Sequence, residues 1–548
     1  MKSYQDTRKL WNKPSQIEGI SPWWFFACIV AVQVLVIAFH VSNRGGFFGD
    51  EIESLWQANG RTNNFHYFQL LEINTWFRSE HIRNLLTVQR GERFDFNAVY
   101  LTLSGMGWGA HPPLHHMLLH AVSSIFPDSF SMWIGASINI VFLVAANVML
   151  YKISMQIIKN KYVALLPSLF WVISSGGLSV AVFLRMYAML TFFFLALVYL
   201  GLCLITGKSK VDWIFCVKLS AVLFFGFFTH YYFIILVAIV ALFLFVWLLY
   251  KKDYKQFRRI FFVMFVTSCY FLGFWPHVIR HILSGPRGTE AFDNFTAMGG
   301  QADVIWQHLK TLNIQLFSGA TILILIGIFI AYIAGALRGT FQKVKIEMPI
   351  AFVLYCSVVY FFIVMMIFPS LEGYLAGLPD GRFIWSVMPF FILIIVCFVH
   401  RAVLLHCVNK RIIAGVMAVI CTFLVAYSFH NRRVQYMWDD RGIPELLSNN
   451  QASAAIVLRC ETHASPHMVR GLFDNLVHFD KIYISETPAS FPRTHPITGS
   501  HITLLFISVN LDLQETLASL PVYTNPWLLI DFHFHSFMIM DWHDGWFG

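Results

Sequence analysis

Long apolar runs, separated by short polar or basic stretches, dominate the chain. A membrane-spanning helix needs roughly 20 mainly apolar residues, and runs of about this kind recur between residues 22 and 429. They predict eleven spans, at 22–41, 130–151, 162–175, 183–206, 212–229, 231–250, 259–279, 312–336, 348–368, 383–405 and 412–429. No small-residue cleavage site follows the first run, so we interpret it as a retained helix and not as a signal peptide.

Composition supports the same class of protein. Hydrophobic residues make up 57% of the 548-residue chain and charged residues only 13%, whereas soluble domains carry about 25% charged residues. The predicted fold class is therefore an α-helical polytopic membrane protein with about eleven transmembrane helices.

Basic residues predict the orientation of the spans. Lys2, Arg8, Lys9 and Lys13 precede the first span, and further Lys and Arg clusters fall on alternate connections. Because cytoplasmic loops carry an excess of Lys and Arg, residues 1–21 are expected to be cytoplasmic and the C-terminus extracytoplasmic. The net charge of +9 is then explained by topology and contact with anionic lipid, rather than by nucleic-acid binding.

Three parts of the chain are expected on the outer side. The first outer loop, 42–129, contains an apolar stretch at 114–126 that is too short to span and is interpreted as interfacial or re-entrant. The second large outer loop is 280–311. After about residue 430, candidate strands and short helical patterns predict a small extracytoplasmic α/β domain over 431–548. The strands are placed at 454–459, 482–485, 502–508 and 527–532.

Carboxylates follow the first span almost directly, at Asp50 and Glu51. Charged groups this close to a bilayer are costly unless they pair, bind a cation or do chemistry. Asp50 is either a loop acid paired with Arg44 or Arg61, or a general base that takes a proton from an attacking hydroxyl or amine.

Other candidate side chains lie at predicted outer helix ends. His111 begins a His-Pro-Pro turn, where it either packs and caps or is positioned for chemistry by the prolines. Arg185 and Arg382 stand at the outer starts of two spans, where they either snorkel to the interface or bind an anion. Guanidinium groups suit phosphate because they present planar, paired donors. A carboxylate base with two such cations is what transfer from a phosphate-linked lipid requires.

Five short motifs occur in order along the chain: Gly49-Asp50-Glu51-Ile52-Glu53-Ser54-Leu55-Trp56, His111-Pro112-Pro113-Leu114-His115-His116, Leu184-Arg185-Met186-Tyr187-Ala188-Met189-Leu190, Phe228-Thr229-His230-Tyr231-Tyr232 and Gly381-Arg382-Phe383-Ile384-Trp385. Together they resemble the motifs of GT-C membrane glycosyltransferases. The resemblance is to the protein mannosyltransferase/aminoarabinose transferase superfamily, of the bacterial glycosyltransferase family 39/83 kind, and it covers about residues 20–430.

The resemblance implies a GT-C catalytic domain over 22–430 that transfers a sugar, with inversion, from a polyprenyl-phosphate donor such as undecaprenyl phosphate sugar. It makes Asp50 the base and gives Glu51 a part in placing acceptor or donor. It assigns donor-phosphate or substrate binding to His111, Arg185, Tyr187, His230, Tyr231 and Arg382. The active site is expected at the outer (periplasmic) face of the bacterial inner membrane.

The sequence leaves alternatives open. The acceptor is a lipid, a glycan or a protein, the last as in protein O-mannosyltransferases. A non-catalytic lipid transporter is the rival from another class. Asp50 and Glu51 could offer oxygen ligands to a divalent metal. Residues 280–311 hold only three scattered acids, so no cofactor is predicted with certainty and a required metal is not favoured.

Overall fold

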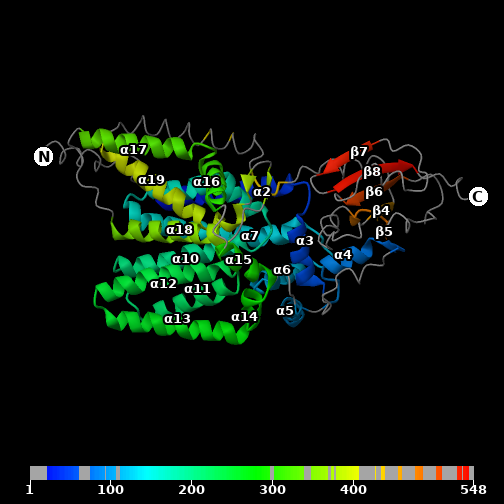
Figure 1. The fold of residues 1–548 in the computed structure, drawn as a ribbon, viewed down its shortest axis with the longest axis horizontal. Coiled ribbons are helices and arrows are strands. Elements are labelled where there is room, and N and C mark those ends of the chain that lie inside the picture. The colour runs from blue at the N-terminus through cyan, green and yellow to red at the C-terminus, as the bar shows by residue number, and fades with distance from the viewer. Residues whose placement is uncertain are drawn as a thin grey trace, which may run out of the picture. The chain divides into compact units, whose positions relative to one another are not determined.

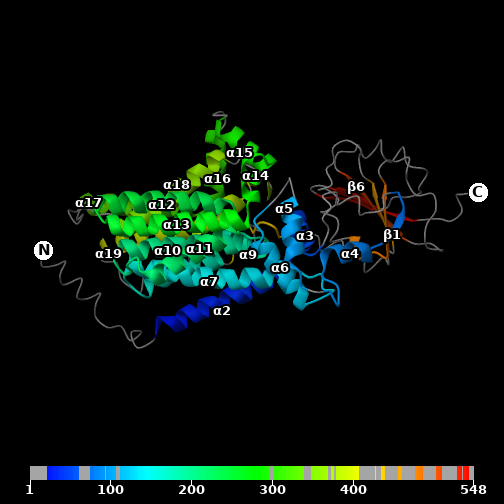
Figure 2. The same cartoon turned by 90° about the horizontal axis from the view of Figure 1, so that it is seen from below.

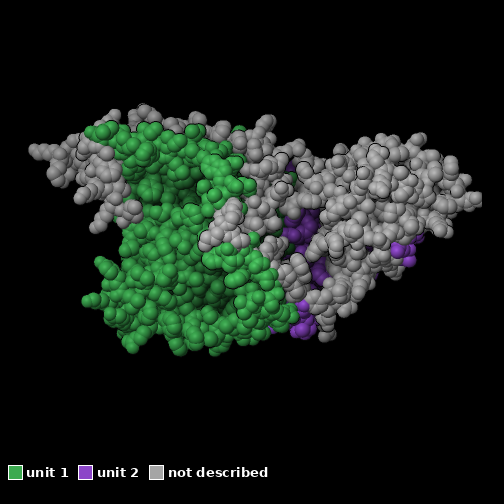
Figure 3. All heavy atoms as spheres, in the orientation of Figure 1, with its two compact units in different colours: residues 1–42, 107–114, 136–437 green, residues 43–106, 115–135, 438–548 purple. Residues whose placement is uncertain are grey.

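The computed structural model describes residues 21–60, 74–92, 94–105, 111–296, 301–337, 347–367, 372–375, 378–379, 381–405, 422, 426, 434–437, 454–458, 476–485, 502–508, 528–532 and 535–541. The chain forms two compact units (Figure 3). Unit 1 comprises residues 1–42, 107–114 and 136–437, and unit 2 comprises residues 43–106, 115–135 and 438–548.

Unit 1 is a bundle of apolar helices (Figure 1). Its described elements are α2 (Pro22–Ser42), most of α7 (Met132–Ile158), η3 (Val163–Leu165), α8 (Leu166–Ile173), α9 (Ser175–Val182), α10 (Tyr187–Ile205), α11 (Trp213–Phe227), α12 (Tyr232–Tyr250), α13 (Tyr254–Phe274), α14 (His277–Leu283), α15 (Pro286–Thr296), α16 (Gln301–Phe317), α17 (Thr321–Leu337), α18 (Met348–Ile367), η4 (Gly381–Phe383), η5 (Trp385–Val387) and α19 (Met388–Leu405), with a two-stranded ribbon of β2 (Glu372–Leu375) and β3 (Leu378–Pro379).

Burial distinguishes the centre of this bundle from its periphery. Of the apolar window in α10, 83% is buried, whereas only 17% of the window in α13 is buried. Helices α10, α11, α12 and α13 lie side by side in both views (Figures 1 and 2). The outer face of α13 exposes aromatic side chains, as expected for a helix surrounded by lipid, where apolar groups have no need to be buried in protein.

The predicted spans agree with these helices. Ten of the eleven coincide with helices of unit 1, and the eleventh, 412–429, lies almost wholly outside the described residues. Seven helices are long and apolar enough to cross a membrane, and two bent pairs raise this number to nine within the described part of the chain. The chain is therefore an integral membrane protein.

Three segments differ from the prediction. The span predicted at 312–336 is the end of α16 followed by α17, a bent pair with an angle of 84°. The span predicted at 162–175 continues to Val182 as the bent pair η3–α8 and α9, with an angle of 57°, because Ser174 ends one helix and caps the next by accepting from the Gly177 amide at 3.0 Å. The segment 280–311, predicted as a loop, is largely helical, with prolines at the starts of α14 and α15. A proline is tolerated there because the first-turn amides have no partner within the helix.

Unit 2 contains short helices and a six-stranded sheet. The helices are α3 (Gly49–Asn59), α4 (Glu80–Leu86), α5 (Phe96–Gly105) and most of α6 (Leu114–Ile125). The sheet has the order β1-β5-β4-β6-β8-β7. Its strands are β1 (Trp76–Arg78), β4 (Ala454–Leu458), β5 (Lys481–Ser485), β6 (Ile502–Ser508), β7 (Leu528–Phe532) and β8 (His535–Asp541).

The sheet joins two segments that are far apart in sequence. Strands β5, β4 and β6 run parallel, while β1 pairs antiparallel with β5 in the register Phe77↔Ile482. Arg83 of α4 donates to the Val477 carbonyl at 3.3 Å. The strand patterns after residue 430 predicted β4, β5, β6 and β7, whereas β1 and β8 were not predicted. For β1 the reason is its length, since three residues at Trp76 carry too little alternation to indicate a strand.

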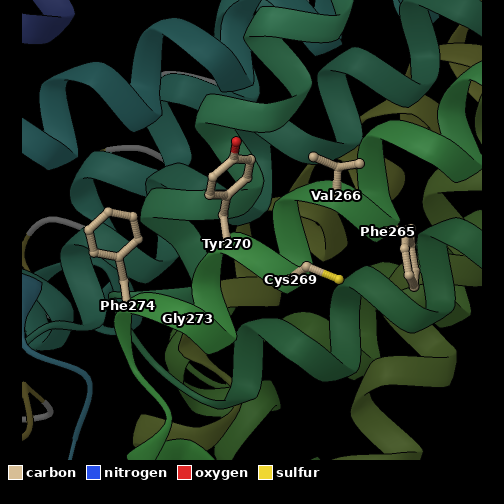
Figure 4. A pocket seen from close by; sticks show the side chains of 6 residues that line it. All are labelled: Phe265, Val266, Cys269, Tyr270, Gly273 and Phe274. Atoms are coloured by element: carbon tan, nitrogen blue, oxygen red, sulfur yellow. The ribbon is translucent and has the colours of Figure 1, made fainter.

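One hollow of about 350 Å³ is lined entirely by α13, through Phe265, Val266, Cys269, Tyr270, Gly273 and Phe274 (Figure 4). It is open and apolar, and it includes none of the predicted site residues. We interpret it as part of the lipid-facing surface of that helix.

Candidate functional site

Several of the predicted site residues gather at one end of unit 1. Helices α10 and α12 begin there, and α11 ends there, because consecutive helices run in opposite directions. The turn before α10 carries Arg185, and the turn between α11 and α12 carries His230. Since the N-terminus of a helix carries partial positive charge, the starts of α10 and α12 add to the positive potential of the arginines.

Arg185 precedes α10 and is held by His111. Arg185 lies in the turn between α9 and α10, and so outside the helix, whereas the predicted span 183–206 included it. Its Nη2 lies 2.8 Å from Nε2 of His111, and the residue is only 5% exposed. Because a guanidinium only donates, Nε2 of His111 accepts and the imidazole proton resides on Nδ1. The hydrogen bond from the Leu114 amide to the Phe228 carbonyl, 3.0 Å, ties the His-Pro-Pro turn to the turn before α12.

His230 lies beside this pair. Its ring centroid is 5.2 Å from that of His111 and 5.7 Å from that of Tyr187. Burial, followed by the positive charges of Arg185 and Arg382, lowers the pKa of His230 from 6.5 to about 3. The Tyr232 amide donates to Nδ1 at 3.1 Å, which leaves the proton of the neutral ring on Nε2.

Arg382 approaches the same group from η4. Its guanidinium carbon lies 5.9 Å from the ring centroid of Phe183, within the range of a cation–π contact. Phe183 in turn stacks on Tyr436 at 4.0 Å, and Tyr187 meets Trp385 edge-on at 5.7 Å. The Phe383 ring also lies near the Arg382 guanidinium, with its centroid 5.7 Å from the guanidinium carbon.

A polar frame behind Arg382 was not predicted from the sequence. The Gly381 amide donates to Oε1 of Gln435 at 3.1 Å, and Nε1 of Trp385 donates to Oε1 of Gln315 at 3.0 Å. A Cβ on Gly381 would lie 2.6 Å from Nε1 of Trp385, so only glycine fits. The Gly381-Arg382 pair in the sequence indicated a site at this position, whereas nothing in the sequence indicated that Gln315 and Gln435 belong to it.

Tyr231, predicted to bind donor or substrate, faces a second network. Nε1 of Trp275 donates to its hydroxyl at 3.0 Å, and the hydroxyl lies 2.7 Å from Nδ1 of His281. Since the hydroxyl accepts from Trp275, we assign it as the donor to His281. Burial raises the pKa of Tyr231 above its usual range, so the phenol stays protonated and links α12 to α14.

The structure gives the two adjacent acids different surroundings within unit 2. Glu51 is 1% exposed, and its carboxylate accepts from Nη1 of Arg44 at 2.8 Å, from Nη2 of the same guanidinium and from the Phe48 amide at 2.7 Å. Asp50 is half-buried in the first turn of α3. Arg44, considered above as a partner of Asp50, thus forms a bidentate pair with Glu51.

This arrangement bears on a metal. In the part of the chain that the structure describes, no three His, Cys, Asp or Glu side chains are grouped to hold a metal ion. Both oxygens of Glu51 already accept from a guanidinium, so a metal ligated by Glu51 would have to displace Arg44. Glu51 therefore does not fit the part of a metal ligand while it is paired with Arg44.

Comparisons with known proteins place this architecture. No protein-family model matches the sequence, and no curated protein matches it. Among solved structures, ArnT from Cupriavidus metallidurans bound to undecaprenyl phosphate matches with a TM-score of 0.51 and 11% identity, over 95% of this chain and 98% of that one. The same enzyme in its apo state matches with a TM-score of 0.48 and 12% identity, over 94% and 97% of the two chains.

ArnT is an aminoarabinose transferase of the GT-C class. The chain therefore has the GT-C fold, which confirms the fold expected from the five motifs. At 11% identity the likeness concerns the fold, and the residue roles have to be argued from this chain's own geometry.

Proposed function

We propose that this protein is an inverting membrane glycosyltransferase that takes a sugar from a polyprenyl-phosphate carrier. The observation that carries the proposal is that Arg185, held by His111, and Arg382, beside Phe183, both act on His230, whose pKa their positive charges lower. Two guanidinium groups and two helix N-termini form a cationic site at the end of an apolar bundle. A phosphate at the head of a long apolar chain fits such a site, since its tail can lie along the spans while its charge meets the arginines.

The chemistry follows from these assignments. Asp50 takes the proton of the acceptor hydroxyl or amine, and the acceptor atom forms a bond to the anomeric carbon as the bond from that carbon to the phosphate oxygen breaks. The phosphate leaves with the electron pair. Arg185 and Arg382 stabilise the charge that grows on it, and His111 keeps Arg185 in place. His230 is neutral and adds a hydrogen-bond donor at Nε2. Tyr187 packs between the rings of His230 and Trp385 and so helps to position His230.

The donor class has independent support. ArnT, whose fold this chain shares, has been crystallised with undecaprenyl phosphate. The active site is proposed to face the outside of the cytoplasmic membrane, where the distribution of Lys and Arg puts the first outer loop. The acceptor is a lipid, a glycan or a protein.

Binding of the carrier tests the proposal. The full-length protein in lipid nanodiscs is titrated with undecaprenyl phosphate, and with undecaprenol as a matched ligand without the charge. The wild type should bind the phosphate at least about tenfold more tightly, since a charge-assisted hydrogen bond contributes about 1.5–3 kcal/mol.

Arg185→Met should abolish this preference for the phosphate, and Arg185→Lys should reduce it. The control is Arg259→Met on α13. It removes a guanidinium whose Nη1 donates to the Val211 carbonyl at 2.8 Å. Equal affinity of the wild type for undecaprenyl phosphate and undecaprenol would overturn the proposal.

A further inference from the structure

Helix α3 carries Asp50 and is held at both of its ends by buried polar groups within unit 2. At its start, Arg44 and Glu51 form a pair whose side chains are 0% and 1% exposed. The Phe48 amide also donates to Glu51, so the carboxylate of the third helical residue closes back over the residue before the helix, as in a capping box. The chain from residue 44 to residue 51 is thereby fixed into one loop.

The pair also separates the two acids by role. Three donors, two from Arg44 and one from Phe48, occupy the Glu51 carboxylate. Neighbouring helical residues point about 100° apart, and Asp50 is the more exposed of the two. A carboxylate that accepts a bidentate guanidinium and an amide inside the protein is poorly placed to take a proton from a substrate.

At the other end of α3, Asn59 forms a second buried network. Its Nδ2 donates to the Leu86 carbonyl at 2.9 Å and to Oγ of Ser123 at 3.1 Å. Its Oδ1 lies 3.3 Å from Nδ1 of His120, and the Asp95 amide donates to Nε2 of His120 at 3.0 Å. Because Nε2 accepts, the proton of His120 is on Nδ1, where it can be donated to Asn59.

This network joins four segments. It connects the end of α3 to the end of α4, to the residue just before α5 and to α6. Asn59 and His120 are 3% and 0% exposed, and Asn59 uses both its amide donor and its carbonyl oxygen. A buried network whose members satisfy one another specifies one arrangement of the elements it joins.

We propose that these two clamps, Arg44–Glu51 and Asn59–His120, are positioning residues that set the place of Asp50 on α3. Glu51 then acts through Arg44 and is neither the proton acceptor nor a metal ligand. This inference rests on the proposed role of Asp50 as the base. It predicts that the clamps govern turnover and leave binding of the donor almost unchanged, because misplacing a reacting group by about 1 Å costs about a hundredfold in rate.

The test is a double-mutant cycle on the full-length protein in nanodiscs, with release of polyprenyl phosphate from undecaprenyl-phosphate sugars as the readout. The variants are Arg44→Met, Glu51→Leu and the double variant, which replaces a buried pair by apolar groups and is expected to fold. We expect all three to lose about 10- to 100-fold in kcat, with the KM for the donor within about threefold of wild type. The double variant should be no worse than either single variant, because the residues act as one unit.

Asn59→Leu should likewise lower kcat and leave the KM for the donor almost unchanged, because it loosens α3 without changing Asp50 or Glu51. Phe479→Leu, a change in a buried side chain of unit 2 outside both clamps, controls for a loss of stability alone and should leave kcat unchanged. Wild-type kcat in the double variant would overturn the inference. So would losses that multiply in the double variant, because Glu51 would then act independently of Arg44.

Asp50→Asn is measured alongside these variants. If that variant keeps its turnover, the assignment of the base in the proposed function is wrong. If Asp50→Asn is inactive while the clamp variants turn over like wild type, only the positioning inference fails.

Discussion

Nη2 of Arg185 lies 2.8 Å from Nε2 of His111, 74 residues away in the sequence. A guanidinium carries five N–H donors, and Arg185 uses one of them in this hydrogen bond, which orients its side chain. The His-Pro-Pro motif thus meets the Arg-Met-Tyr motif through a specific hydrogen bond. This contact gives the first motif a physical task, which is to orient the arginine that we propose to hold the carrier phosphate.

Replacing His111 with Phe should weaken binding of undecaprenyl phosphate by about tenfold, because Arg185 loses the acceptor that orients it and the bond contributes about 1.5 kcal/mol or more. Titration of the variant in nanodiscs measures this loss. His400→Phe, at a half-buried histidine in α19, is the matched control and should bind like wild type. Unchanged affinity in His111→Phe would show that His111 only packs beside the prolines.

Arg382→Lys should also weaken binding, although the charge is kept. A lysine ammonium lacks the planar, delocalised charge that lies over the Phe183 ring, and Arg and Lys are not interchangeable beside aromatic rings. We expect a loss of about three- to tenfold, in line with about 1 kcal/mol for such a contact.

A cycle with Phe183→Leu checks the cause of that loss. If the cation–π contact with Phe183 is responsible, Arg382→Lys should cost less binding free energy in the Phe183→Leu background than in the wild type. Equal costs in the two backgrounds would mean that Phe183 plays no part in holding Arg382.

The pKa of His230, lowered to about 3 by burial and by the two arginines, predicts how stability depends on pH. Between about pH 6.5 and pH 3 the unfolded chain binds a proton at this position that the folded chain does not. The free energy of unfolding therefore falls as the pH drops through this window, by up to about 1.4 kcal/mol per pH unit from this group. Above pH 6.5 the group contributes no pH dependence.

Thermal unfolding of wild type and His230→Gln from pH 4 to pH 7.5 measures this contribution. The Tm of the wild type should fall more steeply than that of the variant below pH 6.5, and the two slopes should agree above it. Parallel curves over the whole range would contradict the lowered pKa.

Gly381→Ala should destabilise the protein by about 1–3 kcal/mol, the usual cost of overpacking. The added methyl group would lie 2.6 Å from Nε1 of Trp385 and 2.7 Å from Oε1 of Gln315. Gly327→Ala in α17 is the control, because nothing lies within 4 Å of its Cβ position and alanine favours a helix. A Tm for Gly381→Ala equal to that of the control would show that η4 has room to adjust.

Apolar runs made most of the membrane architecture predictable, because a span is read from length and composition alone. The same rule could not show that Ser174 and the turn at Arg185 break two runs, since a break of a few residues hardly changes the mean hydropathy. The five motifs predicted the GT-C fold, and the structure brings five of the eight site residues together in unit 1: His111, Arg185, Tyr187, His230 and Arg382.

Other features depend on contacts between distant segments. The bidentate pair of Arg44 with Glu51 was not predicted, because an acid followed by a second acid gives no sign of which one is buried. Strand β1 at Trp76 is stabilised by pairing with β5, some 400 residues later. Gln315 and Gln435 meet Trp385 and Gly381 through single hydrogen bonds, and such partners leave no pattern in one sequence.

The most direct test of the central claim is the rate at which Asp50→Asn releases polyprenyl phosphate from undecaprenyl-phosphate sugars in nanodiscs. Glu53→Gln is the matched control, since Glu53 lies on the same helix and accepts from Nε2 of Gln57 at 3.0 Å. We predict a loss of at least about a hundredfold in Asp50→Asn, the usual contribution of general base catalysis, with normal undecaprenyl phosphate binding and near-wild-type turnover in Glu53→Gln. Turnover by Asp50→Asn at the rate of the control would contradict the account.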